Sequence, residues 1–255
     1  MSELTEESLR VAETAVELTR KNRTAALILA AGNSTRMGKV GSKQFLPLNG
    51  IPVLARTMLA YEKCPLILEI IVAGRKSELK QIIALANQYK ITKLIKVVEG
   101  GSDRAESARR ALNEISKDIR FIAVADGARC LTTPTEIARV CLCAYQNKAA
   151  SAACRVTDTV KRTGTLGNVL ETVDRENLWT VQTPQVFHVA LYAAATVRAK
   201  ADEFHPTDDN AIIEHYGYGV RLIECSRENI KITTPEDLRL AKAILDLREQ
   251  DAAHE

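Results

Sequence analysis

Residues 25–45 read A-A-L-I-L-A-A-G-N-S-T-R-M-G-K-V-G-S-K-Q-F, and this stretch decides the fold. Its first part, Ala25–Ala31, is a short uninterrupted apolar run, which is typical of a strand buried on both faces. The rest combines glycines with cations, a composition that lets backbone N–H groups approach an anion. A buried strand leading into such a loop predicts an α/β protein with a ligand at the carboxyl end of the strand.

Apolar runs and helical patterns alternate along the rest of the chain. We expect strands at 68–73, 94–98, 121–125, 151–156, 220–224 and 229–232. We expect helices at 52–63, 77–88, 103–115, 134–146, 189–201, 208–215 and 235–247. This alternation implies β-α-β units in a Rossmann-like three-layer α/β fold with a mainly parallel sheet. Ligands then gather in the loops after Ala31, Val98 and Ala125.

The segment from Thr157 to Trp179 interrupts this alternation. It is polar, and Gly164 and Gly167 offer a turn, so we expect a β-hairpin arm that projects from the main sheet. Such an arm suits contact with a second subunit, although a flexible surface loop has a similar composition. We therefore divide the chain into a single domain at 25–250, with 157–179 as its arm, and an extension at 1–24. The helical spacing of apolar residues in the extension predicts a short amphipathic helix.

Bulk composition narrows the class of protein. The 255 residues are 46% hydrophobic, which is enough for one sizeable core. A net charge of +3 argues against a protein that coats nucleic acid or an anionic membrane. The chain has no long apolar run, so we expect no membrane span, no secretory signal and a cytoplasmic location. The six cysteines form no Cys-x-x-Cys pair, which argues against a zinc site and suits reduced thiols.

The loop after Ala31 matches neither of two familiar phosphate loops. A P-loop has four residues between its glycines, whereas five separate Gly32 from Gly38, and Val40 follows Lys39. A dinucleotide fingerprint fails because Ser34 stands where its second glycine is required. The loop is also long for a tight Rossmann turn.

A loop of this length suits wrapping a whole triphosphate. Arg36 offers a planar fork to phosphate oxygens, and Lys43 offers a point charge. The plainer alternative is a glycine-rich connection whose cations are solvated. The preceding strand and the α/β pattern favour the phosphate-binding interpretation.

The string A-A-G-x-x-x-R-M, followed by K-Q-F, carries a family resemblance. The chain resembles the 2-C-methyl-D-erythritol 4-phosphate cytidylyltransferases, nucleotidyltransferases of the non-mevalonate isoprenoid pathway. The likeness runs from about Ala25 to Leu247. The first string is shared with many sugar-nucleotide transferases, and the later strings narrow the choice.

The resemblance implies a cytidine site formed by the loops after the strands. The string E-G-G-S-D-R-A-E-S begins at Glu99, and its glycines allow close approach to a flat base. The implied nucleotide-binding residues are Ala30, Ala31, Gly32, Asn33, Gly101, Ser102, Ser107 and Asp126. Ser102 and Asp103 would equally suit a simple helix cap.

The string A-D-G-A-R-C follows the strand at 121–125. Asp126 suits a ribose hydroxyl or a Mg²⁺-bound water, and it also touches the acceptor in the implied site. Arg129 suits a phosphate, or a purely structural ion pair with Asp126. The family usually has proline where Cys130 stands, so the placement of Arg129 is open at this point.

The arm and the segments after it resemble the part of the family that binds the acceptor. The strings D-T-V-K-R and T-V-D-R-E-N-L-W-T-V-Q-T-P-Q contain Thr159, Arg175 and Thr183, and Thr207 follows in P-T-D-D-N. The resemblance implies that these four residues hold methylerythritol phosphate, and that the arm crosses a homodimer. Each threonine taken alone also suits an ordinary structural position.

The string N-I-K-I-T-T-P-E-D-L contains the last residue of the expected catalytic set. The resemblance implies that Lys231 points at the transferred phosphoryl group, beside Arg36 and Lys43. The expected activity is transfer of CMP from CTP to 2-C-methyl-D-erythritol 4-phosphate, with Mg²⁺ held mainly by the CTP phosphates. A cytidylyltransferase acting on ribitol 5-phosphate and a non-catalytic nucleotide sensor remain as alternatives.

Overall fold

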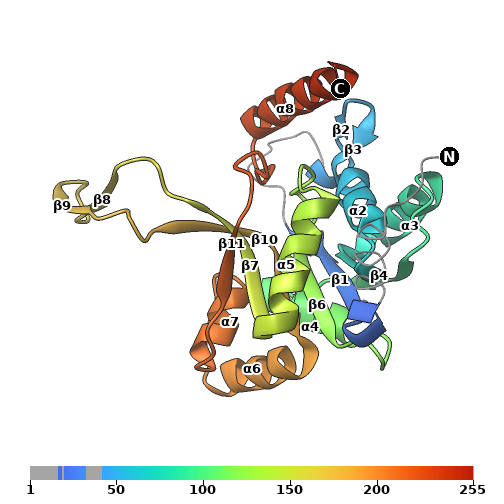
Figure 1. Ribbon diagram of the computed structural model, residues 1–255, viewed down its shortest axis with the longest axis horizontal. Helices are drawn as coiled ribbons and strands as arrows, with labels where there is room; N and C mark the ends of the chain where they lie inside the picture. Colours follow the sequence, from blue (N-terminus) through green and yellow to red (C-terminus); the bar gives the residue numbers. More distant parts are fainter. Residues whose placement is uncertain (1–16, 19, 33–41, 255) are drawn as a thin grey trace, which may run out of the picture.

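The computed structural model describes residues 17–18, 20–32 and 42–254. The amphipathic helix expected within residues 1–24 falls almost wholly outside the described residues, as do Asn33 and Arg36 of the loop. From Thr24 onward the described residues form a central sheet with helices on both faces (Figure 1).

The central sheet has seven strands in the order β11-β7-β10-β6-β1-β4-β5. In that order they are Arg221–Glu224, Ala149–Arg155, Trp179–His188, Phe121–Asp126, Thr24–Leu29, Ile67–Gly74 and Leu94–Glu99. Strands β6, β1, β4 and β5 are parallel, as are β11 and β7, whereas β10 is antiparallel to both of its neighbours. Since parallel strands end at the same edge, the loops after β1, β4, β5 and β6 meet there.

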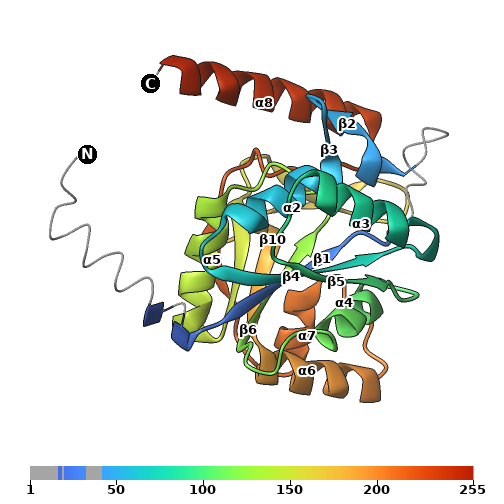
Figure 2. The same cartoon turned by 90° about the vertical axis from the view of Figure 1, so that its right-hand side faces the viewer.

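Helices cover both faces of the sheet and create three layers (Figure 2). The first face is covered by α2 (Val53–Lys63), α3 (Leu79–Gln88) and α5 (Pro134–Asn147). The second face is covered by α4 (Arg104–Leu112), α6 (Val189–Ala201) and α7 (Asp209–His215). Strand β1 shows why, because Ala26 and Ile28 pack into one cluster and Ala25 and Leu27 into the other. The Rossmann-like three-layer fold is confirmed.

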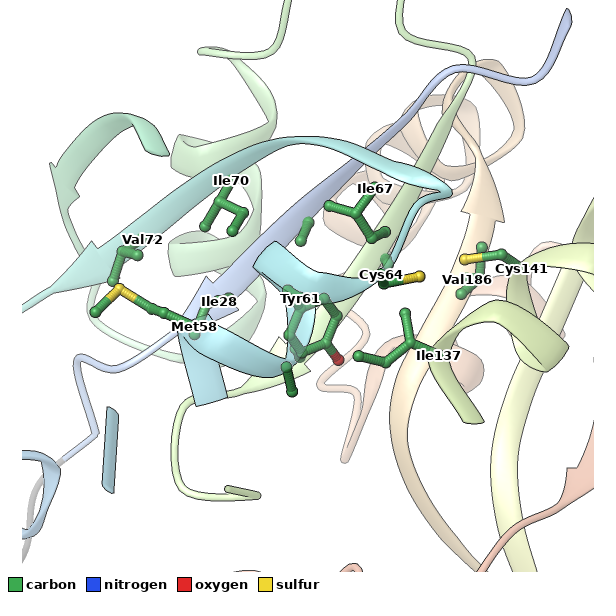
Figure 3. Close-up of a cluster of buried hydrophobic side chains, with 14 of the residues drawn as sticks. Ile28, Met58, Tyr61, Cys64, Ile67, Ile70, Val72, Ile137, Cys141 and Val186 are labelled. Atoms are coloured by element: carbon green, nitrogen blue, oxygen red, sulfur yellow. The ribbon is translucent and has the colours of Figure 1, made fainter. Parts of the chain in front are cut away.

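The core between the sheet and the first helical face is drawn in Figure 3. Ile28 of β1, Ile70 of β4 and Tyr61 of α2 are almost fully buried there. Burial of a large apolar side chain contributes about 1.5–3 kcal/mol, so this layer fixes the position of the strands. Cys64 and Cys141 lie in the same cluster as free thiols, as expected for reduced cysteines acting as small hydrophobic residues.

A third cluster joins the C-terminal helix to the loops at the carboxyl edge of the sheet. Helix α8 (Pro235–His254) lies over the short hairpin of β2 (Pro47–Leu48) and β3 (Ile51–Pro52). The buried members of the cluster are Leu48, Val53, Ala128, Cys130, Leu131, Ile232 and Ala241. Two 3₁₀ turns, η2 (Lys43–Phe45) and η3 (Lys76–Glu78), complete this edge.

The arm is a separate two-stranded sheet that projects from the body of the molecule (Figure 1). Its strands, β8 (Val160–Thr163) and β9 (Val169–Val173), are antiparallel, and Val160 pairs with Val173. Gly167, in the turn between them, has a φ of +79°, a conformation that suits glycine. The projecting β-hairpin expected from the sequence is therefore present.

The observed fold differs from the sequence-based expectations in two places. The segment 229–232 is not a strand. Ile232 N donates to Ala128 O at 2.9 Å, but no further ladder of backbone hydrogen bonds follows. Strand β10 was not expected, and it is the antiparallel strand that lies between β6 and β7. Its middle contains a register shift between Val181 and Gln185, which separates its two paired halves.

Candidate functional site

A cavity of about 480 Å³ opens at the carboxyl edge of the sheet, where ligands are expected in this class of fold. Its wall is built by residues that end or follow β1, β4, β5 and β6, together with the 3₁₀ turn η2 and the segment before α8. Among the predicted site residues, the wall contains Ala31, Gly32, Lys43, Gly101, Ser102, Ser107, Asp126 and Lys231. The structure thus brings together residues from four separate sequence strings.

Lys43 enters the cavity from η2 and is almost buried, with 8% of its surface exposed. Its Nζ donates to Ile232 O at 2.8 Å, one residue after Lys231. The loop lysine therefore also holds the segment that carries the second predicted lysine. Gln44 beside it is buried as well, and its Nε2 donates to Ala30 O at 3.4 Å.

Asp126 is the electrostatic centre of the cavity. Its Oδ2 lies 3.0 Å from Lys231 Nζ and 3.4 Å from Arg129 Nε, and its Oδ1 lies 3.6 Å from Arg104 Nε. Its backbone N–H donates to the Thr183 hydroxyl at 3.1 Å, which fixes the end of β6. One carboxylate therefore gathers three cations from three different elements around the same space.

The pKa of Asp126 shows whether burial or the neighbouring cations have the larger effect on this carboxyl. Burial alone raises the pKa of this carboxyl, but Lys231, Arg104 and Arg129 together outweigh burial and hold the pKa below its ordinary value. Asp126 is therefore ionised at neutral pH, as a metal-bound water or a hydroxyl-binding role requires. The side chain of Lys231 is 40% exposed and lines the same cavity.

Another part of the wall, the turn after β5, contains small residues. Gly100 N donates to Gly74 O at 2.8 Å, and Gly101 N donates to the Ser107 hydroxyl at 2.9 Å. Ser107 also donates to Asp103 O at 2.8 Å, while the Asp103 side chain caps α4 by accepting from Glu106 N. The turn therefore caps α4 through Asp103 and also lines the cavity, while its predicted contact with a base stays a prediction.

Gly100 provides a direct test of this wall. A Cβ at Gly100 would collide with the Cβ of Ala31 and crowd the Ser107 hydroxyl, whereas a Cβ at Gly32 meets no atom within 4 Å. We expect Gly100→Ala to destabilise the fold by about 1–3 kcal/mol through overpacking and to weaken CTP binding. Thermal unfolding should show a Tm lowered by roughly 2–4 °C per kcal/mol, and calorimetry with CTP should show a raised Kd.

Gly32→Ala is the matched control for the fold, because it should leave the Tm unchanged. If Gly100→Ala kept both the Tm and the CTP affinity of the unaltered protein, the close approach of Gly100 to Ala31 would have no role in the site.

Sequence reasoning missed the arginine that connects two carboxylates at this edge. Arg104, in the first turn of α4, pairs with Asp209 at the start of α7 as well as with Asp126. Asp209 is fully buried and also accepts from the Tyr192 hydroxyl at 2.6 Å. A cation in the first turn of a helix opposes the helix dipole, and this signal marks Arg104 as a residue held by tertiary partners.

Four predicted acceptor-binding residues lie away from this wall. Within the described part of the chain, the cavity wall contains neither Thr159 nor Arg175, which are both on the exposed arm. Thr183 is buried and supports Asp126 from inside the protein. Thr207 is exposed and lines a separate hollow of about 470 Å³ beside α7.

Arg129 is held by hydrogen bonds, and Cys130 beside it is buried. Arg129 Nη1 donates to Asn229 O at 2.6 Å, so the guanidinium joins the end of β6 to the segment before Lys231. Cys130 is buried in the third cluster, and burial raises the pKa of its thiol to about 11. The cysteine therefore acts as a small apolar residue next to an arginine that is held in place by Asp126, Asn229 O and Val181 O.

The described residues contain no group of three or more His, Cys, Asp or Glu side chains that is arranged to hold a metal ion. No helix in the described residues combines the length and apolar character needed to cross a membrane.

Comparison with known proteins gives a consistent result. The family model described as 2-C-methyl-D-erythritol 4-phosphate cytidylyltransferase matches residues 24–247. A protein of that name from Halalkalibacterium halodurans is 39% identical over 89% of this chain and 98% of its own length. Another, from Symbiobacterium thermophilum, is 40% identical over 87% of this chain and 92% of its own length.

Solved structures agree with the sequence comparison. A 4-diphosphocytidyl-2C-methyl-D-erythritol synthase from Anaerococcus prevotii superposes with a TM-score of 0.80 and 28% identity, covering 90% of this chain and 99% of that chain. A 2-C-methyl-D-erythritol 4-phosphate cytidylyltransferase from Thermus thermophilus gives a TM-score of 0.72 and 29% identity, covering 86% and 98%. Both likenesses extend over nearly the whole of the solved chains.

Proposed function

The chain belongs to the 2-C-methyl-D-erythritol 4-phosphate cytidylyltransferase family, and from this premise we propose how its residues perform the reaction. The enzyme transfers CMP from CTP to 2-C-methyl-D-erythritol 4-phosphate and releases pyrophosphate, a step in isoprenoid precursor synthesis. A bond forms between an acceptor phosphate oxygen and the α-phosphorus of CTP. The bond from that phosphorus to pyrophosphate breaks.

The observation that carries the proposed mechanism is the convergence of Lys43, Lys231 and Asp126 on one cavity. The acceptor is a phosphate monoester with a second pKa of about 6, so it is already largely ionised and needs no strong general base. The barrier is repulsion between two anions, and fixed cations lower it. In this proposal Lys43 contacts the triphosphate, and Lys231 contacts the phosphoryl group in transfer. Arg36 completes the set by prediction from the sequence alone.

The nucleotide side of the site follows from the glycine wall. We propose that the cytosine lies between the turn of Gly101 and Ser102 and Ala31, which follows β1, with Ser107 holding the turn. Asp126 then faces the ribose or a metal-bound water. The predicted contacts of Ala30, Gly32 and Asn33 belong to the same loop.

Asp126 also fits a role beside Mg²⁺. Its carboxylate is ionised and lines the cavity, and hard cations such as Mg²⁺ prefer oxygen ligands. Because the described residues form no complete cage, the triphosphate oxygens would supply most of the ligands and Asp126 one contact. Bound Mg²⁺ would neutralise charge on the triphosphate and favour departure of pyrophosphate.

The acceptor is proposed to bind between two subunits. Thr207 and Thr183 lie on the body of the chain, whereas Thr159 and Arg175 lie on the projecting arm. An arm that leaves its own body in this way is suited to reach a second copy, so we propose a homodimer in which each arm completes the partner's site. In this proposal residues 25–250 form the catalytic domain, 157–179 its arm and 1–24 an extension. The enzyme is proposed to be cytoplasmic.

A substrate panel tests the activity. We expect purified protein with CTP and Mg²⁺ to release pyrophosphate with 2-C-methyl-D-erythritol 4-phosphate and far more slowly with ribitol 5-phosphate. The measurement is a coupled pyrophosphate assay with each acceptor in turn and a reaction without acceptor as the control. Faster release with ribitol 5-phosphate would assign the alternative substrate, and CTP binding without release from either acceptor would favour a nucleotide sensor.

A further inference from the structure

The point at which the arm leaves the body is held by an arginine that belongs to neither the arm nor the cavity wall. Arg227 lies in the turn after β11 and is exposed. Its Nη2 donates to Arg155 O at 2.8 Å, and its Nη1 donates to the Thr157 hydroxyl. Arg155 ends β7, and Thr157 is the second residue after it, so one guanidinium bridges the end of β7 and the first residues of the arm.

Thr157 is contacted from the arm side as well. Arg175, near the returning end of the arm, donates through Nη1 to Thr157 O. Its own carbonyl accepts from Leu178 N at 3.0 Å, and Val156 N donates to Leu178 O at 3.0 Å. The residue proposed to bind the acceptor phosphate is therefore tied to Thr157, and Thr157 is tied in turn to Arg227.

Arg227 is joined to a part of the body that is well fixed. Two residues later, Asn229 is buried, with its Nδ2 donating to Thr183 O at 2.9 Å and its carbonyl accepting from Arg129. The Arg227 guanidinium thus connects the base of the arm to the same segment that carries Lys231. A planar fork with several donors can fix two acceptors at once, which a lysine ammonium does less rigidly.

We infer that Arg227 is a positioning residue that sets the direction in which the arm leaves the body, and so places Thr159 and Arg175 against the acceptor. This inference rests on the proposed use of the arm in acceptor binding. Arg227 itself touches no substrate in this scheme. Its removal should loosen the arm while leaving the nucleotide cavity of the same chain intact.

The test is a comparison of Michaelis constants. We expect Arg227→Ala to raise the KM for 2-C-methyl-D-erythritol 4-phosphate about two- to fivefold, the size that fits the loss of exposed hydrogen bonds, with the KM for CTP and the Tm unchanged. Arg227→Lys should recover part of the loss. Thr157→Val removes one acceptor of the same pair, so it should raise the same KM and add little in the double variant.

Arg139 provides a matched control, because it is an arginine whose Nη2 donates to Glu224 O at 3.1 Å at the same edge without touching the arm. Arg139→Ala should leave both KM values unchanged. The inference is overturned if Arg227→Ala leaves the acceptor KM unchanged while Arg175→Ala raises it, or if Arg227→Ala alters both KM values and the Tm together. If Arg175→Ala itself leaves the acceptor KM unchanged, the proposed use of the arm fails instead.

Discussion

Lys231→Ala should lower kcat by about a hundredfold or more while the protein remains folded, because the variant loses a cation aimed at the charge that develops during transfer. The side chain of Lys231 is 40% exposed, and its Nζ pairs with Asp126 at 3.0 Å. Asp126 keeps Arg104 and Arg129 as partners after the substitution, so no buried carboxylate is left uncompensated. The measurements are steady-state kinetics with saturating CTP and acceptor, and thermal unfolding of both proteins.

Lys242→Ala is the control for loss of a lysine near the same segment. Lys242 is exposed on α8, pairs with Asp246 at 2.7 Å and is not among the residues that line the cavity. The Lys242→Ala variant should keep the kcat and the Tm of the unaltered protein. A Lys231→Ala variant with near-normal kcat would remove Lys231 from the catalytic set. Lys43 is a less decisive target, since its burial and its bond to Ile232 O make a loss of stability part of any effect.

Much of the fold was predictable because its strands are continuous apolar runs. Strands β1, β4 and β6 are buried on both faces, so their residues carry the signal that a parallel sheet requires. Strand β10 escaped prediction because its centre reads Gln182-Thr183-Pro184-Gln185, where polar residues and a proline argue against a central strand. Its polar side chains are buried by partners from elsewhere, including Asp208 and Asn229.

The strand predicted at 229–232 was wrong for the opposite reason, because its sequence has a strand pattern and its backbone forms no strand. Its alternation of isoleucine with asparagine and lysine has the period of a strand, and Ile232 is indeed buried. The pattern comes from packing in the third cluster, and a single backbone bond to Ala128 replaces a strand ladder. Side-chain burial can therefore set a period of two without sheet pairing.

The cavity was predictable where local strings carry its chemistry. Glycines and cations after β1 and the Gly-Gly turn after β5 mark it without any tertiary information. The contacts of Arg104 were not predictable, because its partner Asp209 lies on a different helix and no spacing rule relates them. The acceptor side was harder to predict, since none of the described arm residues lines the cavity of the same chain.

The proposed dimer makes a strong prediction for mixtures of two impaired variants, assayed at an acceptor concentration too low for Arg175→Ala to work. Lys231→Ala removes a residue of the body, and Arg175→Ala removes a residue of the arm. If each arm serves the partner's body, a mixed dimer contains one site with the intact Lys231 of one chain and the intact Arg175 of the other. Unfolding and refolding the two variants together in equal amounts should then restore about a quarter of the wild-type activity, as random assembly into symmetric dimers requires.

The same mixture distinguishes an arm that acts on its own chain. In that case every site in a mixed dimer would lack either Lys231 or Arg175, and the mixture would be no more active than the two variants alone. Each variant refolded separately is the control for recovery, and a mixture of Lys231→Ala with Lys43→Ala is the control for site assignment. Both of those lysines belong to the body, so that mixture should stay inactive even if the arms cross. Recovery there would mean that Lys43 and Lys231 act from different chains, and the convergence seen in one cavity would need another explanation.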